Sequence, residues 1–229
     1  MDTVVLSIGG SILIPGDSDT AYIKELSKML IGASKMHKIY VVVGGGKTAR
    51  EYIKIGRELG SDESYLDDIG IDTTRLNARL LIAGLSGHAP PTPPKNFDDA
   101  VHLGRNYPIV VMGGTHPGHT TDAVSAMLAE RIRADKLINA TSVDGVYTSD
   151  PKKDKSAKKI NKMTFKELME IVFKSEGVAG QNIVFDALAT KLIARSKITT
   201  IVLNGRDLAS LKNAIEGKDF IGTVISSAV

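Results

Sequence analysis

Cysteine and tryptophan are absent from this 229-residue chain, and aromatic residues make up only 5% of it. The lack of cysteine excludes disulfides, thiolate metal sites and cysteine nucleophiles. Few aromatic side chains are available to stack on bases, and the net charge is only +3, so we expect no nucleic-acid polymer as a partner. No apolar run reaches the roughly 18 to 20 residues of a membrane span. The first residues carry no basic signal-peptide segment, so we expect a cytoplasmic protein without a membrane partner.

What the sequence does contain is an alternation of strand-like and helix-like segments. Hydrophobic residues account for 42% of the chain and charged residues for 24%, as in ordinary globular domains. Short β-branched runs, which include 3–8, 38–43, 107–112 and 199–203, alternate with stretches whose apolar residues recur at helical spacing. This alternation predicts βαβ units around a largely parallel sheet, which is an α/β fold.

The organisation of the chain predicts one domain, because neither an internal repeat nor a separating linker is visible. We expect residues 1–229 to form two lobes that share one sheet, about 1–135 and about 136–229. A helix is expected over 71–85, and 221–225 has the pattern of a closing edge strand.

Three of the predicted strands end in glycine-rich turns that lead into helices: Gly9-Gly10-Ser11, Gly44-Gly45-Gly46 and Gly113-Gly114-Thr115. In an open parallel sheet, ligands bind outside the carboxyl ends of the strands. Glycine lets the backbone approach a phosphate, and a helix N-terminus offers unpaired N–H groups. One such turn is weak evidence, but three predict a site for several phosphates. None of them matches the P-loop or the dinucleotide-binding pattern.

Basic side chains are needed where one phosphate is transferred to another, because donor and acceptor repel each other. Two unit charges ~4 Å apart repel by about 4 kcal/mol at an effective dielectric constant of 20. Lys47 and Arg50 lie three residues apart in the first turn of the helix after the triple glycine, on one face. They are candidates for neutralising this charge, and the alternative is that both are solvated surface residues.

The run from Gly113 to Asp122 is the most unusual stretch of the chain. It combines two histidines, three threonines and an aspartate with glycines, immediately before a helix that Thr120 or Thr121 can cap. Its hydroxyl and N–H groups could bind a second phosphate or a sugar. The His-x-x-His spacing could also indicate a metal, but a hard, oxygen-liganded metal suits phosphate chemistry better than zinc.

With these motifs the chain resembles the amino acid kinase superfamily and, within it, the archaeal uridylate kinases. The matching segments are SIGGS at 7–11, VVVGGGKTAR at 41–50, MGGTHPGHTTDAV at 112–124, TSVDGVYTSDPKKD at 141–154 and FDALATKLIARS at 185–196. The resemblance implies a three-layer α/β/α sandwich and direct in-line transfer of the γ-phosphoryl group of ATP to UMP, with Mg²⁺. It also implies a homohexamer (a trimer of dimers), with the acceptor in the N-terminal lobe and ATP in the C-terminal lobe.

The resemblance further implies a role for each matching residue. Those closest to catalysis would be Gly9, Gly10, Asp122 and Asp186, together with Lys47 as our own candidate. ATP would bind at Gly9, Gly10, Gly46, Arg50, Thr141, Ser142, Tyr147 and Asp150. UMP would bind at Gly45, Asp67, Gly114, Thr115, His116, Pro117, Gly118, His119 and Thr120. The ATP phosphates would hold most of the Mg²⁺ coordination. Asp122, Asp144 and Asp186 are candidates for organising Mg²⁺ or a catalytic lysine, although Asp144 could be a turn residue and Asp186 an N-cap.

One position departs from the superfamily pattern. Ser7 stands where many members carry a lysine that steadies the transferred phosphoryl group. Our hypothesis is that Lys47 supplies this charge, with Lys191 and Lys153 as weaker candidates. Its substitution by methionine should then lower kcat by orders of magnitude and change the KM for UMP little.

Two other functions remain open at this stage. Sibling kinases of the same fold act on acetylglutamate or isopentenyl phosphate, but the latter typically have Ser-Phe-Gly-His where this chain has Lys47-Thr48-Ala49-Arg50. A non-catalytic nucleotide-binding or anion-binding protein is the alternative of another class, and Ser7 favours it. Consumption of ATP that depends on added UMP would separate these functions.

Overall fold

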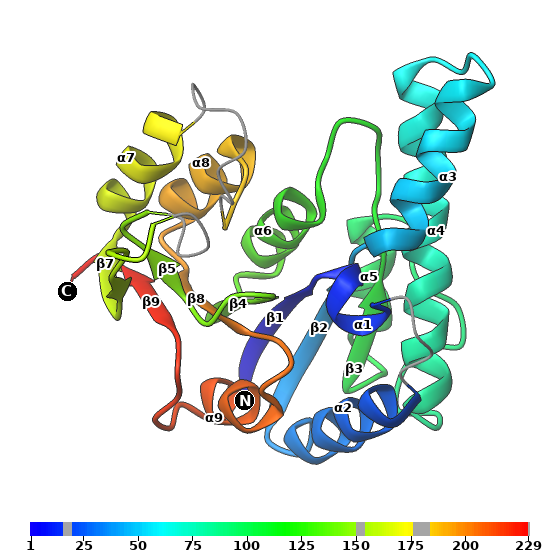
Figure 1. The fold of residues 1–229 in the computed structure, drawn as a ribbon. Helices are drawn as coiled ribbons and strands as arrows, with labels where there is room; N and C mark the ends of the chain where they lie inside the picture. The colour runs from blue at the N-terminus through cyan, green and yellow to red at the C-terminus, as the bar shows by residue number, and fades with distance from the viewer. Residues whose placement is uncertain (16–19, 150–153, 176–183, 229) are drawn as a thin grey trace.

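A single mixed sheet runs through the computed structural model, which describes residues 1–15, 20–149, 154–175 and 184–228. The strand order is β3-β2-β1-β4-β8-β9-β7 (Figure 1). The strands are β1 (Asp2–Ile8), β2 (His37–Val43), β3 (Ile109–Met112), β4 (Lys136–Thr141), β7 (Lys162–Thr164), β8 (Thr199–Asn204) and β9 (Thr223–Ser226). Neighbouring strands are parallel except for β8 and β9. A separate antiparallel pair joins β5 (Val146–Tyr147) to β6 (Lys159–Ile160).

Helices cover both faces of the sheet. They are α1 (Gly10–Leu13), α2 (Thr20–Ala33), α3 (Gly46–Glu58), α4 (Glu63–Gly84), α5 (Phe97–Leu103), α6 (Thr121–Ile132), α7 (Phe165–Ser175), α8 (Ala187–Ser196) and α9 (Leu208–Glu216). Because strand side chains alternate between faces, Leu6 packs in a core with α2, α4 and α9, whereas Val5 packs with α6, α7 and α8. The predicted three-layer sandwich is therefore confirmed.

The order of the strands locates the ligand edge of the sheet. The strands β2 and β3 lie on one side of β1, and β4 and β8 lie on its other side, so the order of the sheet reverses at β1. Ligands bind at such a switch point. The three glycine-rich turns follow β1, β2 and β3, which are mutually parallel and end at the same edge. The fold thus brings together turns that are more than 100 residues apart in sequence.

Two predicted elements differ from the structure. The helix expected over 71–85 begins at Glu63, because the Asp62 side chain accepts a hydrogen bond from the Tyr65 N–H (3.0 Å) and caps it. Its first two turns are mostly exposed and polar, so they carry no apolar periodicity. β9 was expected at the sheet edge, but it lies between β8 and β7. The three-residue β7 is too short for its pattern to be recognised.

The helices α3 and α4 lie side by side and project beyond the sheet at its ligand edge (Figure 1). Within the described ranges, no helix is both long and apolar enough to cross a membrane.

Candidate active site

The turns after β1 and β2 touch each other at the ligand edge. A Cβ atom on Gly10 would lie 2.2 Å from the backbone nitrogen of Gly46 and 2.4 Å from the carbonyl oxygen of Gly44. Gly46 also has φ of +65°, a left-handed conformation that glycine adopts without strain. These glycines are therefore required by the close approach of two backbones, which brings the first residues of α1 and α3 to one place.

A cavity of 330 Å³ opens at this contact. It is lined by the two glycine turns and Arg50, by Thr120 to Asp122 at the start of α6, and by Thr141 and Ser142 at the end of β4. A larger groove of 980 Å³ lies against α7 and the end of α8, but it contains none of the residues predicted to bind ligand. The polar cavity is the better candidate site, since the switch point, the glycine turns and the buried carboxylate all meet there.

Asp122 is the buried acidic group of this cavity, and Ser7 is its partner. The Ser7 hydroxyl donates to the Asp122 carboxylate (Oγ to Oδ1, 3.0 Å). Burial raises the pKa of Asp122 to about 7, the hydrogen bond from Ser7 opposes this rise, and the negative charge of Asp186 adds to it. A hydroxyl cannot compensate a buried carboxylate as a cation would, so Asp122 holds its proton up to nearly neutral pH.

This pKa predicts a pH-dependent stability in the nucleotide-free, metal-free protein. A carboxyl whose pKa is raised by folding contributes its full stabilisation below the unfolded pKa of 3.8, and this contribution is lost as the pH rises from there through the folded pKa of about 7. The free energy of unfolding of the wild type, measured against Asp122→Asn, should fall by about 1.4 kcal/mol between pH 6 and pH 8. Urea unfolding in the presence of EDTA measures the difference, and a constant difference across this range would contradict it.

Asp186 and Thr120 join the starts of two helices beside Asp122. The Asp186 carboxylate accepts from the Ala189 N–H (2.9 Å) and so caps α8, as one of the two interpretations of this residue predicted. Thr120 caps α6 through the Ala123 N–H (3.1 Å), and its hydroxyl also donates to Asp186. This network places the Asp186 carboxylate next to Thr120 and Asp122, both of which line the cavity.

The basic residues predicted near the phosphates are placed differently from one another. Arg50 lines the cavity, and its Nη2 donates to Ser11 Oγ (3.3 Å). Lys47 is exposed, lies 3.8 Å from Glu51, and does not line the cavity. Lys191 lies over the ring of Phe173, 5.4 Å from its centroid. Within the described part of the chain, Arg50 is thus the basic side chain on the cavity wall. Asp150 and Lys153 lie outside the described residues.

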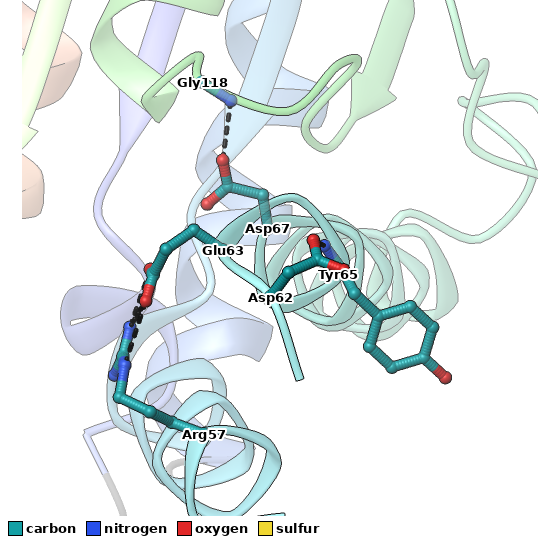
Figure 2. Close-up of polar contacts among 6 residues, drawn as sticks. All are labelled: Arg57, Asp62, Glu63, Tyr65, Asp67 and Gly118. Carbon is teal, nitrogen blue, oxygen red and sulfur yellow. Dashed lines mark hydrogen bonds and ion pairs between the residues drawn. The ribbon is translucent and has the colours of Figure 1, made fainter. Parts of the chain in front are cut away.

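The predicted UMP loop after β3 is held by α4. The Asp67 carboxylate accepts from the Gly118 N–H (2.7 Å), and Figure 2 shows Asp67 pointing from α4 to this loop. Thr115 Oγ1 and His119 Nδ1 are buried without a hydrogen-bond partner among the described residues, which is what a ligand-binding loop would leave open. The rings of His116 and His119 lie 6.3 Å apart, edge to face. Gly114, Gly118 and Pro117 complete the loop.

The predicted ATP residues lie on the other side of the cavity. Thr141 and Ser142 line it directly. Tyr147 lies on β5, and its hydroxyl donates to Asp144 (2.7 Å), whose carboxylate also pairs with Lys159 (3.5 Å). The hydrogen bond from Tyr147 is the main cause that lowers the pKa of Asp144. Asp144 therefore orients the tyrosine at the β5–β6 hairpin.

Three buried polar residues of the site were missed from the sequence. Asn139 on β4 lines the cavity, and its amide donates to the Val184 carbonyl (3.0 Å). Thr74 and Asn77 on α4 contact the glycine turns. Each is a polar residue at a core position of its element, and this pattern could have revealed them. Buried polar groups are nearly always hydrogen-bonded, so such a residue indicates a specific contact.

Glycine turns at the switch point of a parallel sheet, with an arginine and a buried carboxylate on the wall of one cavity, define a protein of the phosphate-binding, phosphotransferase class. The model of the amino acid kinase family matches residues 2–204, and this chain belongs to that family.

Two relatives match nearly the whole chain. The uridylate kinase of Archaeoglobus fulgidus is 49% identical over 223 residues, which are 97% of this chain and 99% of that protein. The uridylate kinase of Methanobrevibacter smithii is 47% identical over 224 residues, 98% of this chain and 99% of that protein. Similarity at this level extends over the entire site.

Solved structures agree with the fold. The match to the crystal structure of uridylate kinase from Archaeoglobus fulgidus covers 99% of this chain and 100% of the chain in that structure, with a TM-score of 0.90. A UMP kinase structure from Ureaplasma parvum has a TM-score of 0.82 at 24% identity, covers 99% of each chain, and shares the fold.

Proposed function

We propose that this protein is a UMP kinase that transfers the γ-phosphoryl group of ATP to UMP and forms UDP and ADP. The observation that carries the proposal is that the glycine turns after β1 and β2 line one polar cavity, together with Thr120 at the end of the predicted UMP loop and with Thr141 and Ser142. The uridylate kinases that match nearly the whole chain support the choice of acceptor. The product would serve pyrimidine nucleotide synthesis.

The proposed mechanism is direct in-line transfer without a phosphoenzyme. The N–H groups of Gly10 and Gly46 bind the transferred phosphoryl group, which lies along the backbone of Gly9, and Arg50 neutralises its developing charge. The acceptor phosphate oxygen is already ionised at neutral pH, so no general base is needed. Catalysis therefore comes from positioning two polyanions and from balancing their charge.

The carboxylates of the cavity fit a magnesium ion held chiefly by the nucleotide. Magnesium prefers oxygen ligands and usually combines one or two carboxylates with substrate phosphates. Asp122 and Asp186 are close enough for the charge of one to raise the pKa of the other, and the described residues contain no cluster of three or more such ligands. When bound, Mg²⁺ would neutralise phosphate charge, while Asp122 and Asp186 would orient it from the protein side.

The proposal is tested by following the products directly. Wild-type protein is incubated with Mg-ATP and UMP, and UDP and ADP are separated by chromatography. We expect one UDP for each ADP, and no ADP without UMP. ADP that appears at the same rate in the absence of UMP, or binding of both nucleotides without any UDP, would contradict the assignment.

We also propose that the protein assembles with itself, in the cytoplasm, as the hexamer of the resembled family does. The exposed face of α3 supports self-association, because Tyr52, Ile55 and Leu59 leave half or more of their surface uncovered. On α4, Leu76 and Leu80 are exposed as well. An isolated exposed leucine is ordinary, whereas several exposed apolar side chains on two adjacent helices support the proposal of a contact surface.

Substitution of Ile55 by glutamate should reduce the assembly to smaller species, since it places a charge in the apolar contact. Light scattering after size-exclusion chromatography measures the mass. The matched control is Met36→Glu, a more exposed apolar residue outside α3 and α4, which should keep the wild-type mass. A wild-type mass of 24.5 kDa would contradict the proposal.

A further inference from the structure

One face of α4 contacts both the acceptor loop and the triple-glycine turn. Asp67, Thr74 and Asn77 are spaced seven and three residues apart, so their side chains leave the helix on the same side. They span ten residues, or about 15 Å of helix. Asp67 is exposed and reaches Gly118, whereas Thr74 and Asn77 are buried between the helix and the ends of the strands.

Thr74 holds the start of the acceptor loop. Its hydroxyl oxygen accepts from the Gly114 N–H (2.7 Å) and donates to the Ile71 carbonyl (2.6 Å). The loop packs tightly on this hydroxyl, because a Cβ atom on Gly113 would lie only 2.4 Å from it. The hydroxyl both donates and accepts a hydrogen bond here, which fixes its orientation.

Asn77 holds the turn after β2. Its side-chain amide donates to the carbonyl oxygens of Gly44 (2.9 Å) and Gly45 (3.1 Å). The side chain is buried, so its loss would leave both carbonyls without this donor. One amide group therefore fixes two consecutive peptide units in the turn whose three glycines closely approach Gly10.

We propose that Thr74 and Asn77 are positioning residues that set the distance between the UMP loop and the triple-glycine turn. Neither lines the cavity, and the Thr74 hydroxyl and the Asn77 amide are both hydrogen-bonded to the backbone of the two loops. Both are rigidly mounted on a 22-residue helix, which holds the two loops at a fixed spacing. The inference rests on the proposed function, since the loops are taken to bind UMP and ATP.

Thr74→Val tests the first contact, because valine keeps the shape of threonine and removes the hydroxyl. We expect the KM for UMP to rise at least tenfold, which corresponds to about 1.4 kcal/mol, while the KM for ATP changes little. Thr74→Ser restores the hydroxyl and should recover most of the loss. The matched control is Thr73→Val, because Thr73 is equally buried and its hydroxyl donates only within α4, to Ile69 (2.8 Å).

Asn77→Asp tests the second contact, because it removes the donor with the smallest change of shape. A carboxylate would face two carbonyl oxygens and push the turn away. The turn contains residues proposed to contact both nucleotides, so the KM for UMP and the KM for ATP should both rise tenfold or more. This pattern differs from that of Thr74→Val. If Asn77→Asp does not fold, Asn77→Ser is measured instead, because it disturbs the same contact less. Both KM values are again expected to rise.

Hydrogen exchange at the Gly114 amide decides the role of Thr74 without any activity. Exchange should become at least tenfold faster in Thr74→Val and stay unchanged in Thr73→Val and Thr74→Ser. Equal exchange and equal KM for UMP in Thr74→Val and Thr73→Val would overturn the inference. If the wild type formed no UDP, the proposed function would fail, whereas this comparison would still decide whether Thr74 holds the loop.

Discussion

Gly10→Ala is expected to lower kcat/KM for phosphoryl transfer by at least about 100-fold, because closely packed sites do not accept an added methyl group without displacement. The added Cβ would meet the backbone of Gly46 at 2.2 Å and that of Gly44 at 2.4 Å. These are backbone atoms of another turn, so no side-chain rotation can relieve the clash. The two turns must separate, and the N–H groups that would bind the phosphates then no longer converge.

The control for Gly10→Ala is Gly32→Ala. A Cβ on Gly32 would meet no atom within 4 Å, and alanine favours a helix such as α2 over glycine. This variant should keep wild-type activity and equal or greater thermal stability. Steady-state kinetics and thermal unfolding of both variants provide the test, and wild-type turnover by Gly10→Ala would show that the contact between the two turns is not required.

Arg50→Met is expected to lower kcat/KM by roughly 100-fold to 1000-fold, the range found when one preorganised charge donor is removed from a catalytic site. Arg50 is the basic side chain on the cavity wall among the described residues, and Ser7 offers no charge there. The reaction rate should fall most at low nucleotide concentration, since the arginine also contributes to binding. Arg50→Lys should recover only part of the loss, because lysine lacks the planar fork of donors.

Lys47→Met belongs in the same experiment. The sequence predicts a large loss of kcat, whereas the position of Lys47 beside Glu51 favours a small one. Lys54→Met is the matched control, because Lys54 is exposed on the same helix and lies 3.8 Å from Glu58, the same distance as in the Lys47 pair. A Lys47→Met variant as impaired as Arg50→Met would assign the missing cation to Lys47. One that behaves like Lys54→Met would leave Arg50 in that role.

Local patterns predicted the parts of the site that depend on local structure. The turns after β1, β2 and β3 follow from glycines at the ends of apolar runs, and the sandwich follows from the alternation of elements. The start of α4 could not be predicted, because its exposed first turns have no apolar period. Asp62 and Glu63 do carry a capping signal, but such a signal alone does not specify a helix.

Contacts between distant segments are the part that the sequence did not disclose. Nothing near Thr74 indicates that its hydroxyl meets Gly114, forty residues later, because only the packing of α4 on β2 and β3 brings them together. The same holds for Ser7 and Asp122, which are 115 residues apart. The identity of Ser7 showed that a cation was missing, whereas the structure shows that its partner is a buried acid.

The most direct test of this account is a coupled ADP-release assay with Mg-ATP and a panel of acceptors: UMP, dUMP, CMP, acetylglutamate and isopentenyl phosphate. Turnover with UMP far above that with acetylglutamate and isopentenyl phosphate is the expected result. This result would show that the cavity at the switch point and the loop held by α4 act in one reaction, phosphoryl transfer to a nucleotide. Faster turnover with acetylglutamate or isopentenyl phosphate than with UMP would contradict the account. So would ADP release at the same rate with and without any acceptor.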